Sequence, residues 1–180
     1  STMLFEGPEG PGELANTILH ESLHATLYVP SQSSFNESVA SFVGDVLAER
    51  WLAQRYGEDA EELRVYRDGQ ADGERRAERM HQAYAELEAV YAAGRPEADV
   101  RREKSRIVSL LMSELDLKRE PNNASLLGFR TYDSGRVELA RLLDACGGDL
   151  RRFVLAVRRV DDPWFDEPQQ EDVGKVALRL

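Results

Sequence analysis

The sequence predicts a mainly α-helical protein, and three observations support that prediction. Glycine, proline and polar residues divide the chain into segments of helical length, at Pro30, Gly57, 94–96 and 147–148. The segments between these breaks repeat apolar residues every three or four positions, as an amphipathic helix does. No sheet is visible, and only residues 173–178 have a pattern that fits a short strand.

The first long helix is expected at Glu13–Tyr28, after an irregular arm at Phe5–Gly12 that is rich in glycine and proline. Pro30 and the polar residues after it end this helix. A second helix is expected at Phe35–Tyr56, with Gly57 as its C-terminal stop. Two antiparallel helices joined by a short loop bring the start of the second beside the middle of the first.

The first helix contains His20, Glu21 and His24 in the spacing H-E-x-x-H, and Glu37 follows thirteen residues after the second histidine. Residues four apart lie on one face of a helix, so both imidazoles can bind one metal ion. Zinc in hydrolytic sites takes three protein ligands and keeps a position for water. The pattern therefore predicts Zn²⁺ held by His20, His24 and Glu37, with Glu21 as a general base within reach of that water.

The alternative is a pair of histidines satisfied inside a core, because H-E-x-x-H fixes only three positions. Two features favour a metal site. This helix holds two of the three histidines in the chain. The residues in and around the motif are also apolar, as a buried site helix needs, at Ile18, Leu19, Leu23, Leu27 and Val29.

A long helical hairpin is expected next, after a break at Arg67–Gly73. Its two charged helices, Glu74–Ala93 and Glu97–Glu120, meet at Gly94-Arg95-Pro96, where glycine ends one helix and proline opens the next. We interpret the hairpin, residues 74–120, as a structural arm with His81 at its surface. Its apolar seam is predicted to contain Tyr84, Leu87, Val90, Tyr91, Ile107, Leu110, Leu111 and Leu115.

A small cluster of helices is expected at the C-terminal end. Asn122 marks a helix start, Arg136–Ala145 forms a helix, and Asp149 caps another at Leu150–Val160. Residues 164–180 are predicted to be an irregular tail with the short strand noted above.

Composition and charge narrow the classes of protein. With 180 residues, 42% of them hydrophobic, the chain can form one domain over residues 1–180. No apolar run reaches the length of a membrane span, and no segment has the order of a signal peptide. A net charge of −10 argues against nucleic acid as a partner. It would favour a basic peptide, although solvated helix faces explain the charge equally well.

Residues 14–52 contain three blocks in a fixed order: LANTI running into H-E-x-x-H, then Phe35-Asn36-Glu37-Ser38-Val39-Ala40-Ser41-Phe42-Val43-Gly44, then Trp51-Leu52. With these blocks the segment resembles a bacterial family of putative aminopeptidases. The resemblance extends more loosely over most of residues 1–160. The family implies a peptide or protein substrate and an envelope or periplasmic location, with an export signal upstream of this chain.

The same block resembles the helix of thermolysin-like gluzincins that supplies the third zinc ligand, which matches Glu37 here. The relatives place an aspartate four residues after that ligand, where it orients a zinc-bound histidine, and this chain has Ser41 instead. Asp45, two turns beyond Glu37, is one alternative for this role, and a carboxylate elsewhere is another. Asn36, Ser41 and Asp45 are therefore candidates for the groups that surround the ligands.

A zinc hydrolase also needs a hydrogen-bond donor near the developing oxyanion. The first two helices offer no obvious one, so Tyr132 is our candidate, with Asn122 and Asn123 as substrate-binding residues beside the metal. The block that contains them also resembles a recurrent feature of the family. The alternative is that the asparagines cap a helix and Tyr132 packs in the core.

Together these patterns predict zincin-like catalytic helices, a helical hairpin and a C-terminal helical cluster, with any β-sheet mostly upstream of this chain. The leading function is a zinc metallopeptidase. Aminopeptidase action comes from the resemblance alone, and because no G-x-M-E-N block is present, endopeptidase action stays open. The rival is a zinc-binding regulatory or interaction module with weak turnover, against which Glu21 argues, because a structural zinc site needs no carboxylate there.

Overall fold

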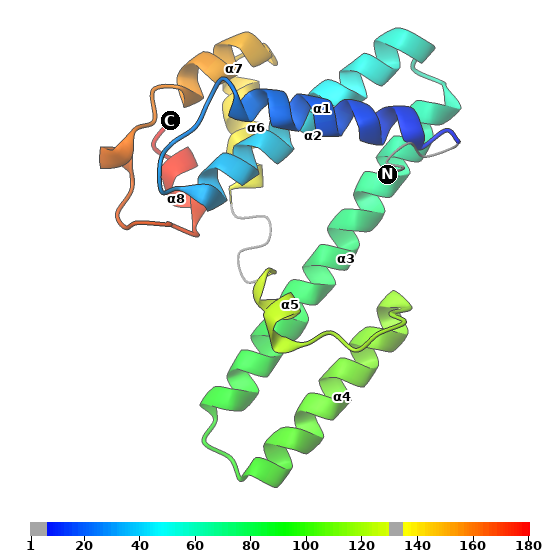
Figure 1. Cartoon of the computed structure of the whole chain (residues 1–180), viewed down its shortest axis with the longest axis vertical. Coiled ribbons are helices and arrows are strands. Elements are labelled where there is room, and N and C mark those ends of the chain that lie inside the picture. Colours follow the sequence, from blue (N-terminus) through cyan, green and yellow to red (C-terminus); the bar gives the residue numbers. More distant parts are fainter. Residues whose placement is uncertain (1–6, 130–134) are drawn as a thin grey trace. The chain divides into compact units, whose positions relative to one another are not determined.

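The computed structural model describes residues 7–129 and 135–180, and within these ranges the protein is helical with no strand (Figure 1). The predicted mainly α fold is confirmed. The chain divides into two compact units, residues 1–69 with 133–180, and residues 70–132. The helices are α1 (Gly10–His24), α2 (Ser33–Tyr56), α3 (Glu61–Ala92), α4 (Glu97–Leu115), α5 (Asn123–Leu127), α6 (Arg136–Ala145), α7 (Leu150–Val157), the 3-10 helix η1 (Asp162–Trp164) and α8 (Val173–Ala177).

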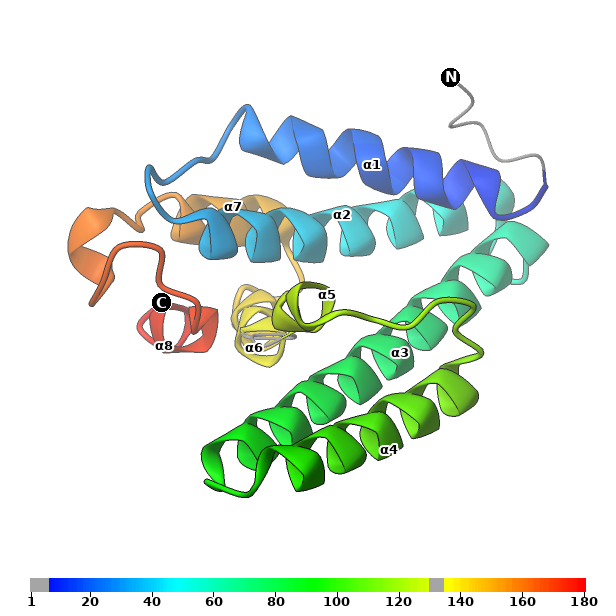
Figure 2. The ribbon, with the colours of Figure 1, turned by 60° about the horizontal axis from the view of Figure 1, so that its bottom comes forward.

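In the first unit α1 and α2 form the predicted antiparallel pair and lie side by side along most of their length (Figure 2). α1 begins at Gly10 and ends at His24, so the predicted arm at Phe5–Gly12 is too long and the predicted end at Tyr28 is wrong. Pro11 occupies the first turn of the helix, where its missing N–H is not needed. α2 begins at Ser33 and ends before Gly57, close to the prediction.

The core of this unit lies between α2 and the C-terminal helices. Phe35 and Phe42 of α2 are buried, and their rings pack against Phe165 and Phe153, with centroid distances of 5.3 and 5.4 Å. Each such side chain contributes about 1.5 to 3 kcal/mol by leaving water. Further buried residues of this core are Leu23, Leu27, Val29, Val39, Ala40, Val43, Leu139, Leu143, Val157, Val160, Val173, Val176 and Ala177.

The predicted break at Arg67–Gly73 is wrong, because α3 continues through it as a single helix of 32 residues. Gly69 and Gly73 each cost about 1 kcal/mol relative to alanine inside a helix, which is not enough to end one. Buried residues on both sides of the stretch, Tyr66 before it and Ala83 after it, hold the helix by tertiary packing.

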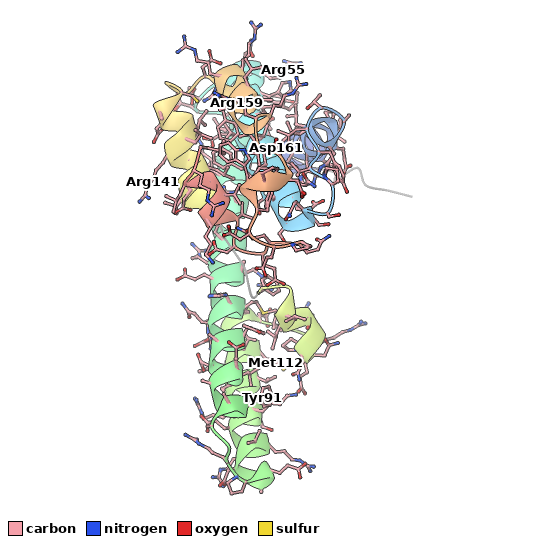
Figure 3. All side chains as sticks on the ribbon, turned by 90° about the vertical axis from the view of Figure 1, so that its left-hand side faces the viewer. Arg55, Tyr91, Met112, Arg141, Arg159 and Asp161 are labelled. Atoms are coloured by element: carbon pink, nitrogen blue, oxygen red, sulfur yellow. The ribbon has the colours of Figure 1, made fainter. Side chains whose placement is uncertain are left out.

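The second unit is the predicted hairpin. The later part of α3 and α4 run antiparallel around a turn in which Gly94 has a left-handed φ of 61°, while charged side chains project outward around them (Figure 3). α4 ends at Leu115 and not at Glu120, because Asp116 also takes a left-handed conformation. The buried seam comprises Ala83, Leu87, Ile107, Leu111 and Leu126.

Three predictions for the hairpin's side chains need correction. The sequence predicts Tyr91, labelled in Figure 3, and Leu110 in the seam, but their exposed fractions are 46% and 42%. The sequence predicts His81 at the surface, but it is half-buried, and its Nδ1 lies 2.8 Å from the carbonyl oxygen of Phe129. His81 therefore holds the segment after α5 against the hairpin.

At the C-terminal end, α6 has the predicted bounds and Asp149 caps α7 by accepting from the backbone N–H groups of Arg151 and Arg152. α7 ends at Val157, three residues before the predicted end. The predicted strand at residues 173–178 is instead the short helix α8, capped by Asp172. Its buried valines are three residues apart, a spacing that suits a helix. None of the helices in the described ranges is long and apolar enough to cross a membrane.

Candidate metal centre

The two histidines of α1 point to a common position. His20 and His24 are four residues apart, so their side chains leave the same face of the helix one turn apart. Their rings meet edge to face with centroids 4.8 Å apart, and the two Nε2 atoms are 3.1 Å from each other. This arrangement presents two nitrogen ligands to one ion.

Glu37 completes the group from the second turn of α2. Its Oε2 lies 3.3 Å from Nε2 of His20, and its Oε1 lies 3.4 Å from Nε2 of His24. The reversal of the chain between α1 and α2 therefore brings the carboxylate to the same position as the two imidazoles. Within the described part of the chain, these three residues form a group able to hold a metal ion.

The separations between the three residues fit a tetrahedral ion. Two atoms that each lie about 2.0 to 2.1 Å from a tetrahedral zinc ion are about 3.3 to 3.4 Å apart. The two Nε2 atoms are 3.1 Å apart, and the nearer carboxylate oxygen of Glu37 is 3.3 Å from that of His20 and 3.4 Å from that of His24, a different oxygen in each case. Two nitrogens and one carboxylate also match the ligand types that zinc takes in catalytic sites. The residues present thus fit zinc by both distance and chemistry.

The centre is accessible to solvent on the side of α2. The side chains of His20 and His24 are 20% and 21% exposed, whereas that of Glu37 is 63% exposed. Structural zinc sites are normally closed by a fourth protein ligand, while catalytic sites leave a position to water or substrate. The accessible side of this group therefore differs from the closed surroundings of a structural zinc site.

Glu21 is the residue next to the first candidate ligand in the sequence. It follows His20 directly on α1 and its side chain is exposed. Among the residues that the structure describes, it has no hydrogen-bond or ion-pair partner. No interaction with a described residue therefore holds its carboxylate in place.

Asn36 holds the loop that brings α2 back to the histidines. Its side chain is buried, its Oδ1 accepts from the N–H of Val29 at 2.9 Å, and its Nδ2 donates to the carbonyl of Val29 at 2.8 Å. Gln32, also buried, donates to the carbonyl of Glu167 and accepts from the N–H of Gln170. These bonds fix the first turn of α2 and hence the position of Glu37.

A comparison with families of known sequences bears on this geometry. The model of the family described as Putative aminopeptidase matches residues 1–171. The chain belongs to the putative aminopeptidase family. The resemblance seen in residues 14–52 is thereby confirmed at the level of the family. No curated protein and no solved structure matches the chain.

In this member of the putative aminopeptidase family, Ser41 and Asp45 do not repeat the arrangement expected of a thermolysin-like site. Ser41 is exposed. Asp45 is half-buried, and the hydrogen bonds that it makes within the described ranges go to Asn16 and Arg136, not to the imidazoles. The role of Asp45 in orienting a zinc-bound histidine stays a prediction, and its contacts indicate a different one.

The second predicted part of the site lies in the other unit or outside the described residues. Asn122 caps α5, with its Oδ1 accepting from the N–H of Ser125 at 2.8 Å, and Asn123 accepts from Lys104 at 3.1 Å. Tyr132 lies outside the described residues. The contacts of Asn122 are those of the alternative, in which it caps a helix. That Asn122, Asn123 and Tyr132 lie beside the metal stays a prediction.

Sequence reasoning missed four residues that meet beside the centre: Asn16, Gly44, Tyr66 and Arg136. Asn16 lies one turn before His20 on the same side of α1. A polar residue on the face that carries the histidines could have indicated a group near the metal site. Gly44 lies inside a long helix, where a glycine often indicates close packing against a neighbouring element. Tyr66 and Arg136 bond to Asn16 and Asp45 from distant segments of the sequence, and no local pattern indicates that they lie there.

Proposed function

We propose that this protein is a zinc-dependent peptidase, with His20, His24 and Glu37 holding the ion. The observation that supports this most is the convergence of the two imidazole Nε2 atoms, 3.1 Å apart, with the Glu37 carboxylate, which places one oxygen 3.3 Å from His20 and the other 3.4 Å from His24. These separations are close to those between the ligands of a tetrahedral ion. When bound there, zinc supplies Lewis acidity that polarises a carbonyl oxygen and lowers the pKa of water from about 16 to about 7.

Glu21 is the general base in this proposal. Its carboxylate accepts a proton from the attacking water and then delivers that proton to the leaving amine, so one group serves both half-reactions. Its exposure and its place next to His20 suit this role. The absence of a partner among the described residues leaves both carboxylate oxygens able to bind the proton.

The substrate class is a peptide with a free amino end, and this part of the proposal comes from the family to which the chain belongs. Comparing peptides with free and acetylated amino ends tests it directly. Preference for the free amine supports aminopeptidase action, whereas equal cleavage of the acetylated peptide at internal bonds would indicate an endopeptidase.

The rival function, a zinc-binding module with weak or no turnover, is less well supported. Such a module needs neither an accessible side at the ion nor an unengaged carboxylate next to a ligand. Both features are present, at Glu37 and Glu21.

The test uses the full-length protein. Metal analysis and anomalous scattering should give about one zinc per chain, held by His20, His24 and Glu37. Glu21→Gln should keep the zinc and lose peptide hydrolysis, and Glu13→Gln, which changes an exposed glutamate on the same helix, is the matched control. A metal site that excludes Glu37, or full activity in Glu21→Gln, would overturn the mechanism.

A further inference from the structure

Four side chains from distant parts of the sequence meet in one polar network. Nδ2 of Asn16 donates to Oδ1 of Asp45 and to the hydroxyl of Tyr66, both at 2.7 Å. Nη1 of Arg136 donates to Oδ2 of Asp45, also at 2.7 Å. Asp45 thus uses both oxygens to join α2 to α1 on one side and to α6 on the other.

This network lies one helical turn from the metal centre. Asn16 precedes His20 by four residues, which is about 6 Å along α1. The surroundings of Gly44 on α2 indicate that the network and the metal centre are also adjacent where α1 packs on α2. A Cβ placed on Gly44 would lie 3.0 Å from Oδ1 of Asn16 and 3.4 Å from Cβ of His20. The space beside Gly44, the residue next to Asp45, is therefore bordered by both the network and a predicted metal ligand.

The bonds of Asp45 are better shielded than those of a comparable pair on the same helix. The side chain of Asp45 is 16% exposed and that of Arg136 is 35% exposed. The ion pair between Glu49 and Arg67, one turn further along α2, has the same 2.7 Å separation but is 44% and 49% exposed. Exposed pairs contribute little to stability because water screens them. Removing one partner of a shielded pair costs more, because the charge that remains is left poorly solvated and unpaired.

We propose that Asp45 is a positioning residue for the metal centre: it holds α1 at the register along α2 at which His20 and His24 meet Glu37. The proposal rests on the zinc binding put forward above. The ligands of the ion are divided between the two helices, so sliding one helix along the other separates the imidazoles from the carboxylate. Metal and catalytic sites lose function when their ligands or reacting side chains are displaced by about 1 Å.

The experiment measures zinc affinity, by competition with a chelator, in protein shown by circular dichroism to be folded. Asp45→Asn keeps the size of the side chain and removes its charge, and Asn16→Ala removes the bridge to α1. Each should lower zinc affinity by about 10- to 100-fold, the usual effect of losing a group that supports metal ligands. Glu49→Gln, the matched control from the exposed ion pair, should bind zinc as the wild type does.

A double variant adds a readout that general destabilisation does not reproduce. If Asn16 acts through Asp45, the loss of zinc affinity in the double variant should be smaller than the product of the two single losses, because both changes break one connection. Should Asp45→Asn fail to fold, Asn16→Ala alone decides the question.

The outcomes separate the two proposals. Wild-type protein that binds no zinc overturns the proposed function, and this inference with it. Wild-type protein that binds zinc, together with wild-type affinity in both Asp45→Asn and Asn16→Ala, overturns only the positioning role.

Discussion

Replacing Gly44 by alanine tests how closely α1 and α2 must approach at the metal centre. The added methyl group would lie 3.0 Å from Oδ1 of Asn16, and 3.4 Å from both the carbonyl oxygen of Asn16 and Cβ of His20. The side chain of Asn16 cannot easily move away, because its Nδ2 is bound to Asp45 and Tyr66. We therefore expect α1 to be displaced by a few tenths of an ångström.

Two effects of opposite sign set the size of the change in stability. Alanine is favoured over glycine inside a helix by about 1 kcal/mol. Overpacking at a tight contact costs about 1 to 3 kcal/mol. The net effect of Gly44→Ala should be a loss of about 0 to 2 kcal/mol in the free energy of unfolding, accompanied by weaker zinc binding.

Gly69→Ala is the matched control, because a Cβ at Gly69 of α3 meets no atom within 4 Å. That variant should gain up to about 1 kcal/mol from helix propensity alone and should bind zinc unchanged. Denaturant unfolding followed by circular dichroism gives the stabilities, and chelator competition gives the affinities. A Gly44→Ala protein that gains as much stability as Gly69→Ala and binds zinc equally well would refute the reasoning.

Three further predictions follow from the same structure. Glu21→Gln should keep one zinc and lower the rate of peptide hydrolysis by about 100-fold or more, measured by steady-state kinetics beside metal analysis; loss of the zinc would mean that this residue is a ligand. Asn36→Ala removes two buried hydrogen bonds and should lower the free energy of unfolding by about 1 to 3 kcal/mol, whereas Gln82→Ala, at an exposed helical position, should stay within about 0.5 kcal/mol of the wild type. Backbone N–H groups, that of Arg152 foremost, hold the pKa of Asp149 below its usual range, so its contribution to stability is present above the unfolded pKa and is lost as pH falls through the folded one. Asp149→Ala should therefore unfold more easily than the wild type at neutral pH and match it in strong acid, and a difference that persists in acid would argue against this origin.

The sequence predicts the elements of this fold where a local signal is strong. Arg136–Ala145 has the predicted bounds, and Asp149 is the predicted cap of α7, because breaks and caps act within a few residues. The grouping of His20, His24 and Glu37 was also predictable, since helix periodicity and one short loop are enough to bring them together.

The errors occur where distant contacts decide the structure. Glycines at 69 and 73 mark a break in the sequence, yet buried residues on both sides keep α3 continuous. Residues 173–178 fit a strand and a helix about equally well, and burial against the core selects the helix. Arg136 pairs with Asp45 across 91 positions, and one sequence alone carries no signal for such a pair.

The short sequence distance between the metal ligands has a consequence for folding. His20 and Glu37 are only seventeen positions apart, and the His24 to Glu37 segment spans thirteen. Closing so short a loop costs little chain entropy, so the three ligands can meet before the rest of the chain is folded. An ion captured at that stage would favour the turn between the first two helices and speed their pairing. If the site is already formed in the transition state, zinc should raise the folding rate and leave the unfolding rate nearly unchanged. Any binding to the denatured chain would reduce the stability gained.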